Sequence, residues 1–120
     1  MVVAGSCHCG AVRIEVPGAP TWIGSCNCSS CAKLGWLLAY YPDDGSVRIA
    51  GETVKYIWGD RMIGLHHCPT CGCGTHWDSL GESYGKVGVN VRLLDGFAVD
   101  QGRFLFVGEP LEIRYLDNAG

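Results

Sequence analysis

The arrangement of the cysteines is the feature of this sequence that most constrains its fold. All eight lie in three short clusters: Cys7-His8-Cys9, Cys26-Asn27-Cys28-Ser29-Ser30-Cys31 and Cys68-Pro69-Thr70-Cys71-Gly72-Cys73. A C-x-x-C turn directs two sulfur atoms at one ion, and a glycine after the second cysteine permits the tight backbone of that turn. The clusters therefore predict metal ligands, and two such elements from distant parts of the chain would make one tetrahedral site.

A disulfide framework is the alternative interpretation of the same cysteines. The residues before Cys7 carry no positive charge and are fewer than the about 7–15 apolar residues of a secretion signal. No apolar run approaches the roughly 20 residues that span a bilayer, so we expect no membrane partner. These observations predict a cytoplasmic protein, in which thiols stay reduced and disulfides do not persist.

Ligand counting divides the cysteines into two zinc sites. One closed site of four thiolates would be structural, because a saturated ion has no open position. Structural zinc contributes on the order of 10 kcal/mol, which outweighs the entropy of closing the long loop between its ligands. The ligands of this site would be Cys7, Cys9, Cys68 and Cys71.

The middle cluster would form the second site. Cys26, Cys28 and Cys31 are three thiolates on one short loop, and three protein ligands with an open position are the pattern of a catalytic zinc. We therefore expect two zinc ions per chain. Cys73 has three interpretations: the fourth ligand of this second zinc, a spare thiol near the first site, or a small buried residue. As a fourth ligand it would close the second site and change its chemistry.

The pattern between the clusters predicts an all-β fold. Val12, Ile14 and Val16 alternate with Arg13 and Glu15, as in a half-buried strand. The 18 glycines and 10% aromatic residues favour short strands joined by tight turns. We expect a single domain at residues 1–120, a β-sandwich or open barrel of short antiparallel strands stapled by zinc. Strands are predicted at 11–16, 37–41, 47–50, 53–58, 63–67, 86–91 and 112–115, and one or two helical turns at 96–101.

The charge pattern argues against nucleic acid as a partner. The net charge is −3, and the nine basic residues are scattered singly along the chain. No basic stripe is present to neutralise phosphates.

Histidines and tryptophans are weaker candidates for chemistry. His66, His67 and His76 flank the third cluster and His8 lies within the first, so any of them could act on protons near neutral pH. Each also has an ordinary structural explanation. The tryptophans are expected to be core residues or pocket walls: Trp22, Trp36, Trp58 and Trp77.

The cysteine motifs resemble those of a known family. The order Gly5-Ser6-Cys7-His8-Cys9-Gly10, Cys26-Asn27-Cys28-Ser29-Ser30-Cys31, Cys68-Pro69-Thr70-Cys71-Gly72 and Val89-Asn90-Val91-Arg92 resembles the glutathione-dependent formaldehyde-activating enzymes, a family that also contains centromere protein V. The resemblance runs from residue 5 to about residue 94, and Cys73 is extra to the motif. It implies an Mss4-like β-sandwich, with the same division into a structural zinc and a catalytic zinc.

The resemblance also implies a reaction. The family joins glutathione to formaldehyde, giving S-hydroxymethylglutathione, and is classed as a carbon–sulfur lyase. The expected partners are therefore a small thiol and an aldehyde. The alternative is a non-catalytic, zinc-stapled module that binds another protein, which would require both zinc ions to be fully thiolate-ligated. Iron in place of zinc is a third interpretation, because Cys68-Pro69-Thr70-Cys71-Gly72 is similar to one rubredoxin knuckle.

Overall fold

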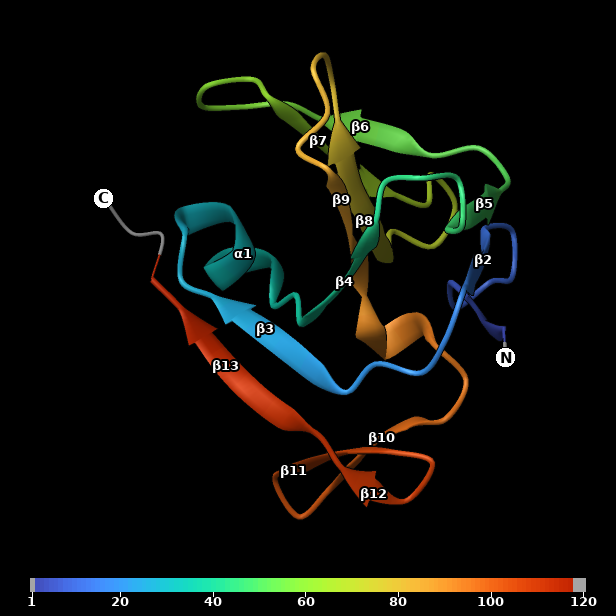
Figure 1. The fold of residues 1–120 in the computed structure, drawn as a ribbon. Coiled ribbons are helices and arrows are strands. Elements are labelled where there is room, and N and C mark those ends of the chain that lie inside the picture. The colour runs from blue at the N-terminus through green and yellow to red at the C-terminus, as the bar shows by residue number, and fades with distance from the viewer. Residues whose placement is uncertain (1, 118–120) are drawn as a thin grey trace.

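Nearly all of the regular structure is β. A computed structural model describes residues 2–117, in which the strands are joined by one short helix, α1 (Ser29–Leu34), and a 3-10 turn, η1 (Val91–Leu93) (Figure 1). This all-β fold agrees with the expected Mss4-like class. Within the same residues, no helix is long and apolar enough to cross a membrane.

A seven-stranded sheet forms the centre of the molecule, in the order β13-β3-β4-β9-β8-β7-β6. The neighbouring strands from β3 to β6 pair antiparallel, but β13 pairs with β3 in parallel, register Ile113 to Ile23. The expectation of antiparallel strands is thus wrong at this edge, where the chain returns after its last hairpins and lies alongside β3 (Figure 1). The strands of this sheet are β3 (Trp22–Cys26), β4 (Leu38–Pro42), β6 (Val54–Tyr56), β7 (Ile63–His67), β8 (Gly74–Ser79), β9 (Lys86–Asn90) and β13 (Glu112–Leu116).

Two three-stranded antiparallel sheets complete the fold, in the orders β1-β2-β5 and β10-β11-β12. The first packs against the central sheet as the second layer of a sandwich, and the second lies at the lower end of the view in Figure 1. Their strands are β1 (Val3–Ser6), β2 (Arg13–Val16), β5 (Arg48–Ala50), β10 (Phe97–Asp100), β11 (Arg103–Phe106) and β12 (Glu109–Pro110).

The main core fills the space between the two layers. Ile14 and Val16 of β2 are buried against Ile23, Ala39 and Val89 of the central sheet. Fully burying such a side chain stabilises the fold by about 1.5–3 kcal/mol. The predicted alternation in β2 is confirmed, because its intervening residues are exposed.

The other face of the central sheet carries a second apolar cluster. Leu38, Leu65 and Trp77 project from β4, β7 and β8 on this face and pack near Cys31. The indole of Trp77 lies so close to β9 that a Cβ at Gly88 would overlap it. Both faces of the central sheet are therefore apolar, and only one is covered by a second sheet.

The predicted strands each overlap an observed strand, but the predicted helix is wrong. Residues 96–101 contain β10, which turns back into β11 through Gln101 and Gly102. Both turn residues have positive φ, 51° and 77°, as a type I′ hairpin requires. Strands β1, β3, β8, β11 and β12 and helix α1 were not predicted.

Candidate metal centres

The first and third cysteine clusters meet in one place. The Sγ atoms of Cys7, Cys9, Cys68 and Cys71 all lie within 4.8 Å of one another. Cys9 Sγ is 3.7 Å from both Cys7 Sγ and Cys68 Sγ. Cys7 and Cys68 are buried, whereas Cys9 is exposed. This four-cysteine cluster consists of the same residues that ligand counting grouped.

Backbone N–H groups point at these sulfur atoms. The N–H of Val12 donates to Cys7 Sγ at 3.3 Å, and the N–H of Thr70 donates to Cys68 Sγ at 3.4 Å. Backbone hydrogen bonds from Cys73 and Cys9 lower the pKa of Cys71 to about 5. Donors of this kind stabilise a thiolate relative to a thiol. The turns therefore present sulfur in the form that binds a metal ion.

The middle cluster forms a separate group at the end of β3. Cys26 ends this strand, Cys28 is the N-cap of α1, and Cys31 lies within the helix, with their Sγ atoms within 4.8 Å of one another. The N–H of Cys28 donates to Cys26 Sγ, and the N–H of Cys31 donates to Cys28 Sγ, both at 3.4 Å. We refer to these residues as the three-cysteine cluster. Gly35, at φ 71°, ends the helix one turn later.

The three thiols differ in their readiness to ionise. Burial acts to raise the pKa of Cys28, but hydrogen bonds from the Ser30 hydroxyl and the Cys31 backbone lower it to about 7. Burial and the adjacent Cys28 raise the pKa of Cys31. Three sulfur atoms this close cannot all be ionised at neutral pH without a cation among them, because like charges repel. Both cysteine clusters could accordingly hold a metal ion, and none of the eight cysteines, all within residues 2–117, forms a disulfide.

Cys73 lies with the four-cysteine cluster. It packs against Cys7, Val12 and Cys68, and its backbone carbonyl accepts from the Cys68 N–H at 2.9 Å. It is not among the residues whose sulfur atoms converge at the three-cysteine cluster. Cys73 thus lies beside the four-cysteine cluster, two positions after Cys71 in the sequence.

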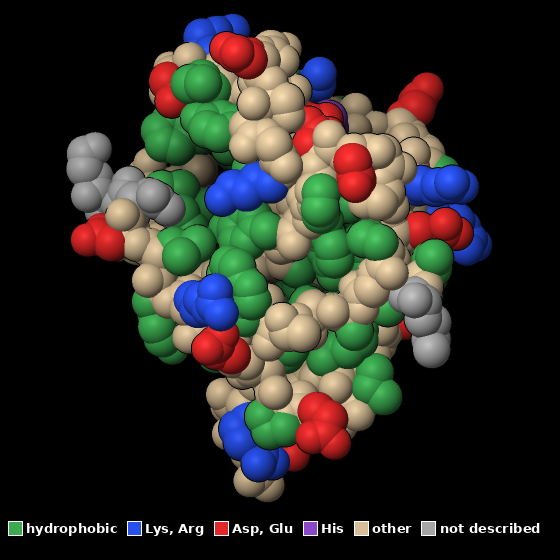
Figure 2. Space-filling model, viewed as in Figure 1, with side chains coloured by type: hydrophobic (Ala, Val, Ile, Leu, Met, Phe, Trp, Pro, Cys, Tyr) green, Lys and Arg blue, Asp and Glu red, His purple; other side chains and the backbone are tan. Residues whose placement is uncertain are grey.

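A cavity of about 760 Å³ opens beside the three-cysteine cluster. This volume falls within the range of about 300–1,000 Å³ that holds small-molecule ligands. Its floor is the uncovered apolar face of the central sheet, with Leu38, Leu65 and Trp77 among the lining residues. Figure 2 shows hydrophobic side chains gathered on this face of the molecule, with basic side chains between them. The three sulfur atoms thus border a space large enough for a substrate.

Aromatic and charged side chains shape the rest of the cavity. Trp58, Tyr84 and Tyr115 are exposed lining residues. Lys86 Nζ lies 4.7 Å from the centre of the Tyr40 ring, within range of a cation–π contact. Burial and the nearby cysteines raise the pKa of Tyr40 to about 12. A basic group and a phenol that stays protonated therefore share the cavity with the thiols.

Sequence analysis found only part of this site. Trp58 and Trp77 are pocket walls and Trp36 is buried, as predicted. Trp22 differs: it is half-buried, and its ring lies 5.5 Å from that of Tyr40. No histidine of residues 2–117 lines this cavity. Tyr40 and Lys86 were missed, because a strand buried on both faces gives no signal of which side chains border a cavity.

Comparison with known proteins adds two matches. The sequence model of the family described as glutathione-dependent formaldehyde-activating enzyme matches residues 2–103. A crystal structure of a protein from Rhodobacter sphaeroides is 28% identical in sequence, covers 92% of this chain and 99% of its own, and superimposes with a TM-score of 0.70. Among curated proteins, no sequence matches significantly.

Proposed function

Because the chain belongs to the glutathione-dependent formaldehyde-activating enzyme family, we propose that it adds a small thiol such as glutathione to formaldehyde or a related aldehyde. In this proposal the reaction takes place at a zinc ion held by Cys26, Cys28 and Cys31. A second zinc, held by the four-cysteine cluster, is structural. The protein would then be a carbon–sulfur lyase of the S-hydroxymethylglutathione synthase type.

The spacing of the sulfur atoms supports zinc as the ion. Zinc–sulfur bonds of about 2.3 Å in a tetrahedron place the sulfur atoms about 3.8 Å apart. The Cys7–Cys9 and Cys9–Cys68 separations, both 3.7 Å, agree with that edge. A disulfide would instead need about 2.05 Å. The four-cysteine cluster therefore fits a closed tetrahedral thiolate site.

The position of the three-cysteine cluster beside the cavity is the observation that carries the proposal. Three sulfur donors leave one tetrahedral position for an external ligand, and these donors border a space of about 760 Å³. Cys73, the residue that could have closed this site, packs at the other cluster. This arrangement favours an open site over the fully ligated pair that a purely structural module would need.

The chemistry requires one bond to form and one proton to move. The thiol loses its proton, the thiolate sulfur bonds to the aldehyde carbon, and the π pair of the C=O bond moves to oxygen. That oxygen takes up one proton, so S–H has added across the C=O bond overall. When bound, zinc would lower the pKa of a coordinated thiol and polarise a carbonyl group. Tyr40 lines the cavity and its phenol stays protonated at neutral pH, so its hydroxyl would donate a hydrogen bond to the developing oxyanion.

Lys86 would select the thiol. It is the basic side chain lining the cavity within residues 2–117, and glutathione carries carboxylates that a small neutral thiol lacks. The indole of Trp77 and the other apolar walls limit the access of water to the thiolate and strengthen this electrostatic attraction.

Cobalt substitution tests the proposal directly. Adding glutathione to the cobalt-loaded protein should change the thiolate absorption bands, and Cys28→Ser should abolish the change. Lys86→Gln should weaken glutathione several-fold more than it weakens 2-mercaptoethanol. If millimolar glutathione leaves the spectrum unaltered, the thiol-addition proposal is wrong and a zinc-stapled binding module takes its place.

A further inference from the structure

The strand β13 forms one wall of the cavity beside the three-cysteine cluster. It runs parallel to β3, and the register places Leu116 next to Cys26, the first cysteine of that cluster (Figure 1). Tyr115, Leu116 and Asp117 are among the residues that line the cavity. The family match ends at residue 103, before β13 begins. This wall of the candidate site is therefore contributed by a segment outside the family match.

Side-chain contacts hold β13 against β3. The guanidinium carbon of Arg114 lies 4.2 Å from the centre of the Trp22 ring, within range of a cation–π contact. Leu116 occupies the space that a side chain at Gly24 would need, because a Cβ there would lie 2.8 Å from Leu116 Cδ1. The two strands are thus matched residue by residue, and β13 reaches the cluster in a defined position.

The end of β13 binds the residue between the first two cysteines. The N–H of Asn27 donates to the Leu116 carbonyl at 3.1 Å, and its side-chain Nδ2 donates to Asp117 Oδ1 at 3.0 Å. A carboxylate acceptor makes a charge-assisted hydrogen bond, which is stronger than one between neutral groups. Backbone and side chain of Asn27 are therefore both fixed by β13. We refer to Asn27 and Asp117 as the Asn27–Asp117 pair.

The arrangement of the sulfur atoms depends on this turn. Asn27 separates Cys26 from Cys28, and the N–H of Cys28 donates to Cys26 Sγ at 3.4 Å. A change in the Asn27 backbone dihedrals would break that hydrogen bond and move Cys26 Sγ relative to Cys31, which lies within α1. Metal ligands are oriented by partners that do not themselves bind the ion, and losing such a partner typically weakens metal binding by about 10–100-fold.

We propose that the Asn27–Asp117 pair is a positioning device for the three-cysteine cluster, through which the C-terminal strand holds the Cys26–Cys28 turn in the geometry that binds a metal ion. The identity of that ion, zinc, rests on the proposed function. Asp117 acts through Asn27 and not on the substrate. Its loss should therefore change the affinity and the ligand field of the metal at this cluster, with little change in the stability of the fold.

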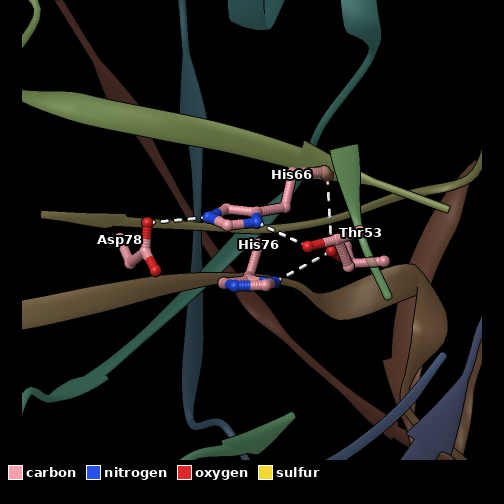
Figure 3. Close-up of polar contacts among 5 residues, drawn as sticks. Thr53, His66, His76 and Asp78 are labelled. Atoms are coloured by element: carbon pink, nitrogen blue, oxygen red, sulfur yellow. Dashed lines mark hydrogen bonds and ion pairs between the residues drawn. The ribbon is translucent and has the colours of Figure 1, made fainter. Parts of the chain in front are cut away.

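A different aspartate hydrogen bond provides the matched control (Figure 3). Asp78 Oδ1 lies 2.8 Å from His66 Nε2, and the His66 and His76 rings stack with centroids 4.2 Å apart and planes inclined by 13°. Thr53 Oγ1 and Thr75 Oγ1 lie 2.8 and 2.9 Å from Nδ1 of His66 and His76. Because the stacked rings direct their nitrogen lone pairs side by side, this histidine cluster is a hydrogen-bonded network and does not suit a metal ion. Asp78 is not among the residues that line the cavity.

Cobalt titration of the full-length chain tests the pair. Asp117→Ala should weaken the second cobalt ion about tenfold and alter its absorption bands, while the ion in the four-cysteine cluster stays bound. Asp117→Asn keeps an oxygen that accepts from Asn27 Nδ2, so it should bind cobalt like the parent. Asp78→Ala should lower the midpoint of thermal unfolding and leave both cobalt affinities and both spectra unchanged.

A double-mutant cycle shows whether the two residues act together. Asn27→Ala should weaken the second cobalt ion as much as Asp117→Ala does, and the double variant should be no weaker than either. Additive losses, or a second cobalt affinity unchanged by Asp117→Ala, would overturn the positioning role and leave the thiol-addition proposal standing. A parent protein that binds cobalt only at the four-cysteine cluster would overturn both.

Discussion

Replacing one cysteine in each cluster should show that the two clusters contribute very differently to the stability of the fold. The four-cysteine cluster joins Cys9 to Cys68, 59 positions apart. Closing a loop of that length costs about 4 kcal/mol from the logarithmic length dependence. A structural zinc supplies on the order of 10 kcal/mol, as much as the total stability of many domains. Cys7→Ser, at a buried position, should therefore abolish the cooperative unfolding transition.

The matching change in the three-cysteine cluster should be mild. Cys28 caps α1 by accepting from the Cys31 N–H, and serine is a favoured residue at that position. The three cysteines lie within one short segment of the chain, so losing the metal site there does not free a long loop between its ligands. Cys28→Ser should cost less than about 1 kcal/mol, a shift in unfolding midpoint of a few degrees, while one of the two zinc ions is lost.

Thermal unfolding followed by far-ultraviolet circular dichroism, at one scan rate for all proteins, measures this difference. Elemental analysis of the same samples gives the zinc content. Similar midpoints for Cys7→Ser and Cys28→Ser would refute the division into a structural and a local site.

Three further predictions concern the metal and the cavity. A chelator should remove one of the two thiolate-bound zinc ions much faster than the other, because a closed site offers no position for attack; equal rates, followed with a zinc indicator, would contradict this. Gly88→Ala should displace the Trp77 indole, cost about 1–3 kcal/mol and change the tryptophan fluorescence, whereas Gly81→Ala, where a Cβ meets nothing within 4 Å, should be neutral within about 0.5 kcal/mol. Cys73→Ala should leave the glutathione titration of the cobalt protein unchanged; tighter binding would place Cys73 at the three-cysteine cluster.

Most of the correctly predicted secondary structure came from local sequence patterns, above all the alternation of apolar and polar residues. The alternation around Ile14 and Val16 reports directly which face of β2 is buried, because side chains in a strand have a period of two. The turn after β10 was hard to predict, because Gln101 adopts a positive φ that type I′ turns normally give to Asn, Asp or Gly. Strand β3 contains Gly24 and Ser25, which have low strand propensity. Its strand conformation therefore depends on pairing with its neighbours β13 and β4.

Long-range placement was predictable only where a chemical constraint linked the segments. A closed tetrahedral site needs four ligands, so Cys7 and Cys68 could be grouped across the sequence, and their sulfur atoms do lie together. No such rule connects Tyr40, Lys86 and Tyr115, which reach the cavity from three different strands. The histidine cluster was hidden for the same reason: the pairing of His66 with His76 depends on the register of β7 and β8.

The long separation within the four-cysteine cluster also has a consequence for synthesis of the protein. At about 5–20 residues per second, the ribosome needs roughly 3–12 seconds to pass from Cys9 to Cys68. The three-cysteine cluster emerges complete within about a second or so at the same rate. Under the proposed zinc assignment, a nascent chain would bind its local ion first, while Cys7 and Cys9 would lack Cys68 and Cys71 until the second half of the chain is made.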